Sequence, residues 1–207
     1  MTSTMAWQPA LFGGGDVQFD LGFGGARQVW LDRTAWLEVT PGWLRGADEL
    51  FRAVLTKTGW RSREVRMYER ILPEPRLTHY WRPAEGQSLP HPVLLEIADS
   101  LSARYRVEFS QIGANLYRHG ADSVAWHGDR VARELPEAVV ALVSLGAARP
   151  FRLRPKGGGR SVGLLPGPGD LVVMGGSCQR TWEHSVPKVK GVGPRISLQF
   201  RHAYPDG

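Results

Sequence analysis

The amino-acid sequence predicts a mainly β protein, a sandwich or barrel with flanking helices, and three observations lead to this fold class. From about Val107 onward, short segments of alternating apolar and polar residues are separated by glycine and proline, which is typical of many short strands. Before that point, two stretches carry apolar residues at helical spacing. The 207 residues, 42% hydrophobic and 22% charged, have the length and composition of one folded domain.

The first half of the chain divides into two predicted regions. Residues 1–30 contain six glycines among scattered aromatic side chains and predict an irregular N-terminal segment. Residues 31–106 predict a helical and lid region packed on the core. Within it, Asp48 is placed to cap a helix that ends at Gly59, and Pro92 fits the first turn of a second helix. The apolar positions are Leu50, Phe51, Val54 and Leu55 in the first helix, and Val93, Leu94, Ile97, Ala98 and Leu101 in the second.

Residues 107–207 are predicted to form the β core of the same domain. The hydrophobic period changes here from helical to alternating, and glycine or proline marks the ends of the segments. The predicted strands cover residues 107–112, 115–118, 123–129, 138–145, 151–154, 161–165, 170–174, 182–186 and 195–202.

The positive charge of the chain lies in its second half. The net charge is +6, and residues 101–207 carry 15 basic and 8 acidic side chains. Five basic residues follow one another without an intervening acid: Arg149, Arg152, Arg154, Lys156 and Arg160. Such a field fits a polyanionic partner such as nucleic acid, and the alternative is an ordinary solvated surface.

Two further features concern the location of the protein. The longest nearly apolar run, residues 138–148, is much shorter than the roughly 20 residues of a membrane-spanning helix, which predicts no membrane association. Cys178 is the single cysteine, and the first basic residue is Arg27, too late for the charged start of a secretory signal. The sequence therefore predicts a cytoplasmic protein.

One short motif and one distant histidine form a candidate metal site. His127 and Asp129 are two residues apart on a predicted strand and therefore emerge on one face, with Gly128 between them. His184 lies 57 residues after His127. Two histidines and one carboxylate on one side of a metal are the facial triad of non-haem Fe(II) oxygenases. The alternative is that a His-x-Asp sequence occurs here by chance and binds no metal.

The last predicted strand carries a second chemical signal. Ile196, Leu198 and Phe200 share one face, and the other face carries polar residues with an arginine at each end, Arg195 and Arg201. Guanidinium groups on a buried face require anions, which a dicarboxylate ligand together with Asp129 would supply. The alternative is an edge strand whose arginines are solvated.

These motifs occur in one order and at one spacing that match a known family. They are Pro75–Thr78, Asn115–Tyr117, His127–Asp129, Gly169–Met174, His184–Pro187 and Arg195–Arg201. Over about residues 60–204, the chain resembles the AlkB family of Fe(II)/2-oxoglutarate-dependent dioxygenases. The resemblance implies a double-stranded β-helix, or jelly roll, with an N-terminal nucleotide-recognition extension.

The resemblance also implies roles for individual residues. His127, Asp129 and His184 would hold Fe(II), and together with Arg201 they form the implied catalytic set. The implied contacts to the cosubstrate 2-oxoglutarate are Asn115, Tyr117, Arg195, Ser197 and Arg201. Arg195 would pair with the distal carboxylate, and Arg201 would lie near Asp129 at the iron end. Many relatives have asparagine where this chain has Ser197, which weakens the expected hydrogen bonding of the cosubstrate.

The implied activity is oxidative demethylation of N-alkylated bases of the 1-methyladenine and 3-methylcytosine type. It would act on DNA and possible RNA substrates, couple 2-oxoglutarate and O2 to succinate, CO2 and formaldehyde, and contribute to DNA alkylation repair. Members of the family clamp the base between an aromatic ring and an iron-ligand histidine. The candidate substrate contacts are therefore Arg76, Tyr80, Trp81 and His127, within a lid of about residues 60–82. No obligate protein partner is evident.

Two other functions stay open at this point. One keeps the iron and the cosubstrate but hydroxylates a small molecule, a protein or a modified RNA. The other is a non-catalytic nucleic-acid-binding module with the same fold. Arg130 and Val131 stand where many DNA-repairing relatives have acidic residues that read the base, so the base preference does not transfer from the family.

Overall fold

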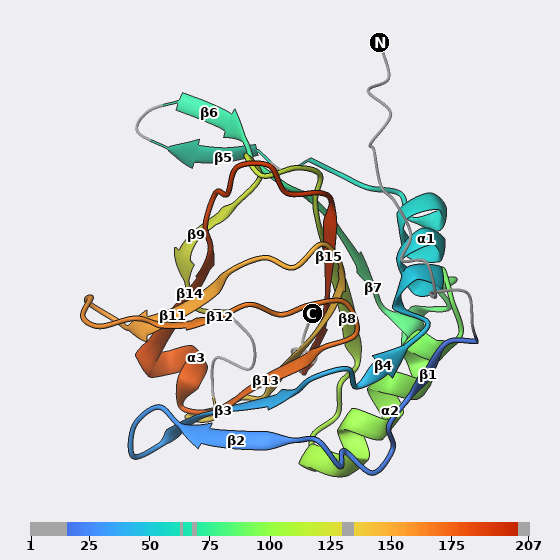
Figure 1. Cartoon of the computed structure of the whole chain (residues 1–207), viewed down its shortest axis with the longest axis horizontal. Coiled ribbons are helices and arrows are strands. Elements are labelled where there is room, and N and C mark those ends of the chain that lie inside the picture. Colours follow the sequence, from blue (N-terminus) through green and yellow to red (C-terminus); the bar gives the residue numbers. More distant parts are fainter. Residues whose placement is uncertain (1–15, 63, 68–69, 130–134, 203–207) are drawn as a thin grey trace.

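Two antiparallel sheets face each other in the computed structural model, which describes residues 16–62, 64–67, 70–129 and 135–202 (Figure 1). The strands of the larger sheet lie in the order Arg27–Trp30 (β2), Ala35–Thr40 (β3), Leu171–Gly176 (β13), Val140–Gly146 (β10), Arg195–Arg201 (β15), Gln111–Tyr117 (β8) and Leu77–Trp81 (β7). Those of the smaller sheet are Val162–Leu164 (β12), Phe151–Pro155 (β11), Trp182–Val186 (β14) and Val124–His127 (β9). This is the predicted jelly roll.

Helices α1 (Ala47–Lys57) and α2 (Val93–Tyr105) pack on the outer face of the larger sheet, on the side away from the smaller sheet (Figure 1). Successive strand residues point to opposite faces, so each central strand places alternate side chains in the core beneath the helices and in the space between the sheets. Along β15, Ile196, Leu198 and Phe200 are fully buried in the core beneath the helices. The alternate residues of β15 therefore point between the sheets, and the face assignment predicted for this strand is confirmed.

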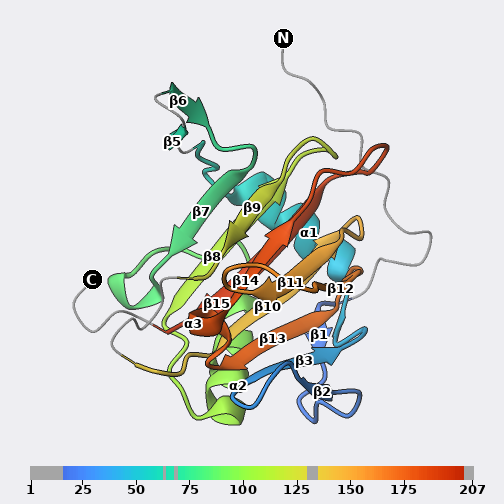
Figure 2. The ribbon, with the colours of Figure 1, turned by 90° about the vertical axis from the view of Figure 1, so that its left-hand side faces the viewer.

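Several smaller elements complete the fold. Gln18–Phe19 (β1) pairs with Leu44–Arg45 (β4), and Cys178–Thr181 (α3) is a single helical turn before β14. Glu64–Met67 (β5) and Arg70–Pro73 (β6) form a separate hairpin that projects beyond the two sheets (Figure 2). A 3-10 turn covers Pro83–Glu85. Across the described ranges, every helix is too short or too polar to cross a membrane.

The predicted division of the chain at residue 107 is wrong, because the larger sheet takes strands from both sides of it. β3 and β7 belong to this sheet although they lie in the region predicted as helix and lid. β1 and β2 likewise form within the segment predicted to be irregular up to residue 30. Local sequence does not reveal these strands because their partners are remote: Leu37 of β3 lies opposite Met174 of β13.

Two element boundaries also differ from the prediction. The segments predicted at 107–112 and 115–118 form one strand, β8, which begins at Gln111 and continues through Gly113. Helix α1 follows Gly46, which has a positive φ of 68°, so Asp48 lies inside the first turn and is not the cap. The remaining predicted strands are confirmed, with ends that shift by a few residues.

Candidate active site

The two candidate metal-ligating histidines face each other on neighbouring strands of the smaller sheet. His127 ends β9 and lies directly opposite His184 of β14 in the strand register. Their ring centroids are 4.3 Å apart. Asp129 lies two residues beyond the end of β9, and one ligand atom from each of the three side chains lies within 4.8 Å of the other two. The predicted clustering of these three residues is confirmed.

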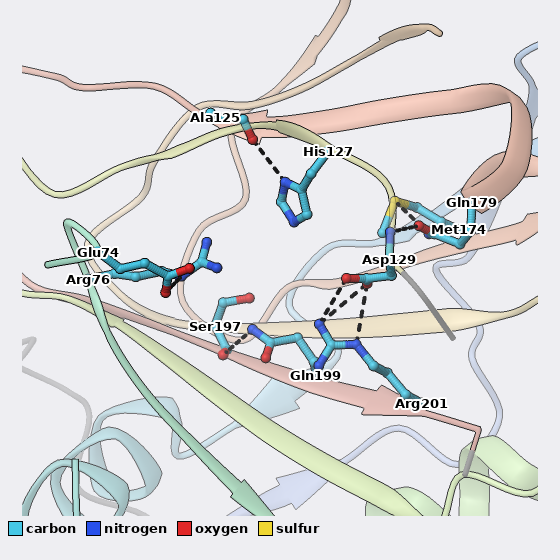
Figure 3. Close-up of polar contacts among 10 residues, drawn as sticks. All are labelled: Glu74, Arg76, Ala125, His127, Asp129, Met174, Gln179, Ser197, Gln199 and Arg201. Carbon is cyan, nitrogen blue, oxygen red and sulfur yellow. Dashed lines mark hydrogen bonds and ion pairs between the residues drawn. The ribbon is translucent and has the colours of Figure 1, made fainter. Parts of the chain in front are cut away.

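Because β9 ends at His127, strand alternation does not place Asp129, and contacts from other elements hold it instead. The backbone N–H of Asp129 donates to Oε1 of Gln179 in α3 at 2.9 Å (Figure 3). At Gly128, a Cβ atom would lie 2.9 Å from the carbonyl oxygen of Gln179, so the close approach favours glycine. His127 Nδ1 lies 2.9 Å from the carbonyl oxygen of Ala125, which leaves Nε2 available as a metal ligand.

The charges around the triad favour metal binding. Arg201 Nη2 donates to Asp129 Oδ1 at 3.2 Å (Figure 3). Burial is the largest single effect and alone would raise the pKa of Asp129, but the Arg201 charge, the two histidines and the Arg201 hydrogen bond together outweigh it and lower that pKa below its usual value. Burial, followed by the neighbouring His127, lowers the pKa of His184 to about 3. At neutral pH the site therefore offers an ionised carboxylate and a neutral His184, the forms that bind a metal.

A second set of polar residues lines the same pocket from the larger sheet. Its members come from the inner faces of β15 and β8: Arg195, Ser197, Gln199, Arg201, Asn115 and Tyr117. Strand register explains the grouping, because Arg195 lies opposite Tyr117 and Ser197 lies opposite Asn115. Figure 3 shows Ser197, Gln199 and Arg201 on the side of the pocket opposite His127. All residues that the family resemblance assigned to the cosubstrate therefore lie in one pocket with the triad.

Four buried polar atoms of residues that line this pocket have no hydrogen-bond partner within the described residues. They are Nε of Arg76, Nη1 of Arg195, Oδ1 of Asn115 and Oε1 of Gln199. Buried polar atoms are normally paired, so this group of unpaired atoms indicates a ligand-binding surface. A guanidinium that is 2% exposed suits a carboxylate, and two amides supply further polar contacts along the ligand. The residues fit an oxygen-donor metal ligand with a distal carboxylate, such as 2-oxoglutarate.

A family model matches the part of the chain that forms this pocket. The model described as "2OG-Fe(II) oxygenase superfamily" matches residues 37–201, which include the triad, the smaller sheet and the larger sheet except β2 and the start of β3. The chain belongs to this superfamily. It is an Fe(II)/2-oxoglutarate-dependent dioxygenase, and the cofactors of its class are Fe(II), 2-oxoglutarate and O2.

Within this superfamily, the chain is similar to proteins that are named as AlkB homologues. It is 31% identical to Alpha-ketoglutarate-dependent dioxygenase alkB homolog 3 of Bos taurus, over 79% of this chain and 64% of the relative. It is also 31% identical to DNA oxidative demethylase ALKBH2 of Arabidopsis thaliana, over 69% of this chain and 57% of the relative. A crystal structure of a Pseudomonas putida prolyl-4-hydroxylase matches with a TM-score of 0.45 and 18% identity, over 62% of this chain and 73% of that one. The dioxygenase spans less than two thirds of the length of the two AlkB relatives.

The three other predicted substrate residues occupy different environments in this dioxygenase. Arg76 lines the pocket beside the triad and pairs with Glu74 at 3.5 Å. The ring of Tyr80 lies on the inner face of β7, where its centroid is 5.9 Å from Cζ of Arg201. It has room because Gly113 lies opposite, where a Cβ atom would be 3.0 Å from the ring. Trp81 points the other way and is buried in the core beneath the helices, so its predicted role as a base-stacking ring is wrong.

The basic segment 149–160 is not one exposed patch. Arg149 is fully buried, and Arg154 pairs with Glu183 at 3.0 Å. Arg152, Lys156 and Arg160 are exposed. The positive surface predicted from this segment is therefore smaller than its sequence indicated.

Three residues that hold the site in place were not predicted. Gln179 positions Asp129, and Ser144 accepts a hydrogen bond from Nε of Arg195 at 2.9 Å. Gln199 shares the polar face of β15 and donates to the carbonyl oxygen of Ser197 at 2.7 Å. The polar face of the last strand already contained a signal for Gln199. Gln179 and Ser144 carry no local signal, because each acts on a residue about 50 positions away in the sequence.

Proposed function

We propose that this dioxygenase removes N-linked methyl groups from bases of nucleic acid and so contributes to DNA alkylation repair. The observation that carries the proposal is the His127–Asp129–His184 cluster, which shares one pocket with a buried, incompletely paired Arg195. The similarity to relatives named as dioxygenase AlkB homolog 3 and as a DNA oxidative demethylase supports the substrate class. The expected bases are 1-methyladenine and 3-methylcytosine.

The cofactors supply the oxidation, and the protein supplies binding and electrostatics. When bound, Fe(II) with 2-oxoglutarate and O2 inserts one oxygen atom into a C–H bond of the methyl group, and the other oxygen leaves in succinate as CO2 is released. The C–N bond of the resulting N-hydroxymethyl group then breaks: its electron pair returns to the ring nitrogen, the hydroxyl proton is released, and formaldehyde leaves the repaired base. Arg195 would hold the distal carboxylate, and Arg201 keeps Asp129 ionised. No protein nucleophile is needed.

The substrate would enter from the side of Arg76 and Tyr80. In this proposal, the methylated base stacks between the Tyr80 ring and His127, and Arg76 contacts the adjoining phosphate or base edge. The β5–β6 hairpin lies next to β7 in sequence and would form the lid over the strand. A base must leave the stack to reach the pocket, which favours single-stranded or locally opened DNA, with RNA as a second substrate. Action without an obligate protein partner and a cytoplasmic location remain predictions.

Formaldehyde release from methylated oligonucleotides tests this function. We expect the Fe(II)-loaded enzyme with 2-oxoglutarate to form formaldehyde and succinate in equal amounts on single strands that contain 1-methyladenine or 3-methylcytosine. The unmethylated strands should give succinate only at the slow background rate. Failure on every methylated DNA and RNA strand, with intact cosubstrate binding, would instead favour a hydroxylase of a small molecule or a protein.

Tyr80 and Trp81 provide a matched pair of variants for the substrate side. Tyr80→Ala is expected to lower oligonucleotide turnover about 10- to 100-fold, because stacking of a base on an aromatic ring is worth about 1–3 kcal/mol. Tyr80→Phe keeps the ring and should retain most of the turnover. Trp81→Ala should instead lower the free energy of unfolding by about 3–5 kcal/mol, because it opens a cavity in the core. Steady-state kinetics and chemical denaturation measure these effects; normal turnover of Tyr80→Ala would contradict the assignment.

A further inference from the structure

Arg149 is a fully buried arginine for which the proposed reaction has no role. It lies in the connection between β10 and β11, and none of the ion pairs within the described residues includes it. Its guanidinium donates three hydrogen bonds to carbonyl oxygens, those of His119 (3.2 Å), Asp122 (2.8 Å) and Pro187 (2.9 Å). The Asp122 carboxylate attracts this charge but forms its ion pair with Arg118. A buried charge without an ion pair of its own is costly, and its position therefore requires an explanation.

The three carbonyl groups belong to two loops that directly follow the pocket-lining residues Tyr117 and Val186. The loop after β8 contributes two of them, and the loop after β14 contributes the third. These loops also contact each other: the N–H of Val189 donates to the carbonyl oxygen of Gly120 at 2.9 Å. A Cβ atom at Gly120 would lie 1.6 Å from the carbonyl oxygen of Val189, so glycine is required for this contact. Arg149 thus joins the β8, β10 and β14 ends of the sandwich.

The residue assigned to the distal carboxylate of the cosubstrate lies where the first of these loops begins. β8 ends at Tyr117, and β15 begins at Arg195, directly opposite. The Cζ atoms of Arg149 and Arg195 each lie 5.6 Å from the centroid of the Tyr117 ring. The Tyr117 ring therefore contacts two buried guanidinium groups, and Nη1 of Arg195 has no partner within the described residues. The Arg149 charge acts on Arg195, whose pKa is lowered first by burial and also by Arg149, and two neighbouring positive charges favour the binding of an anion.

We propose that Arg149 is a positioning residue for the cosubstrate: beside the Tyr117 ring it adds a second buried positive charge that selects a ligand with a distal carboxylate. The inference rests on the proposed assignment of Arg195 to that carboxylate. It differs from a purely structural role in one measurable respect. A structural clamp would affect every 2-oxo acid equally, whereas the charge acts on the distal carboxylate alone.

Binding of two 2-oxo acids to the full chain, loaded with Fe(II) in the absence of O2, separates the two roles. The ligands are 2-oxoglutarate and 2-oxopentanoate, which has a methyl group in place of the distal carboxylate. Arg149→Met is expected to weaken 2-oxoglutarate binding about tenfold in calorimetry and to change 2-oxopentanoate binding less than about twofold. In turnover, the KM for 2-oxoglutarate should rise by the same factor, with kcat nearly unchanged.

Two further variants control this experiment. Arg149→Lys keeps the charge and should recover part of the lost affinity, whereas Arg152→Met, which removes an exposed arginine of the next strand, should bind both ligands normally. Equal weakening of both ligands, or no weakening of either, would overturn the proposal. If Arg149→Met does not fold, Arg149→Lys is compared with the wild type instead. The proposal is then overturned if the two proteins bind 2-oxoglutarate equally well and also bind 2-oxopentanoate equally well. Failure of the wild type to bind 2-oxoglutarate would instead refute the cosubstrate site itself.

Discussion

Replacement of His127 by alanine is expected to abolish cosubstrate turnover while the protein stays folded. The substitution removes one of three ligands from a cluster whose ligand atoms lie within 4.8 Å of one another. Loss of a residue that merely supports a metal ligand costs about 10- to 100-fold in affinity, so loss of a ligand should cost more. His127 is half-buried, and its neighbour in the strand register, His184, stays in place. We therefore expect the free energy of unfolding of the metal-free protein to change by no more than about 1–2 kcal/mol.

Metal binding, turnover and denaturation of the same preparation test this expectation. The matched control is His119→Ala, because the His119 side chain is exposed and the contact of this residue with Arg149 uses only its backbone carbonyl. This control should bind metal and turn over like the wild type. Retention of full iron-dependent activity by His127→Ala would show that the metal site has been assigned to the wrong residues.

Strong local patterns made much of the β core predictable. Along β15 the polar and apolar residues alternate without exception, and a one-residue shift in register would bury the wrong face. β14 also begins and ends at the predicted residues, because the sequence marks both of its ends clearly. The triad could be predicted because the spacing of His127 and Asp129 and the sequence around His184 match a chemically demanding motif. In these segments the local sequence and the tertiary structure favour the same conformation.

Other features depend on contacts that a local pattern does not contain. β3 pairs along its length with β13, which follows it by about 130 residues, and such pairing sets its boundaries more than its own propensity does. Gly113 continues β8 although glycine usually interrupts a strand, because its missing side chain leaves space for Tyr80. Arg149 appeared to belong to an exposed basic segment, yet three carbonyl groups from two other loops surround it.

Removal of the Arg195 guanidinium is expected to have opposite effects on the free protein and on its cosubstrate complex. Arg195 is 2% exposed, its Nε donates to Ser144 Oγ at 2.9 Å, and burial lowers its pKa to about 10, so it is still charged at neutral pH. Without an anion, this buried charge opposes folding. Removal of the buried charge should raise the free energy of unfolding of the unliganded protein by about 1–3 kcal/mol, and loss of the hydrogen bond to Ser144 should lower it by about 1 kcal/mol. Unliganded Arg195→Met should therefore be as stable as the wild type or more stable.

With 2-oxoglutarate present, the order of stability should reverse. At a concentration of about 100 times Kd, the ligand should stabilise the Fe(II)-loaded wild type by about 2.7 kcal/mol, and Arg195→Met should gain almost nothing. Because charged hydrogen bonds are worth about 1.5–3 kcal/mol each, kcat/KM for 2-oxoglutarate should fall about 10²- to 10³-fold. Arg195→Lys, which keeps the charge but loses the bidentate geometry, should lie between the two proteins. Thermal denaturation with and without 2-oxoglutarate measures this reversal in the order of stability. If the cosubstrate stabilised Arg195→Met as much as the wild type, the distal carboxylate would bind elsewhere.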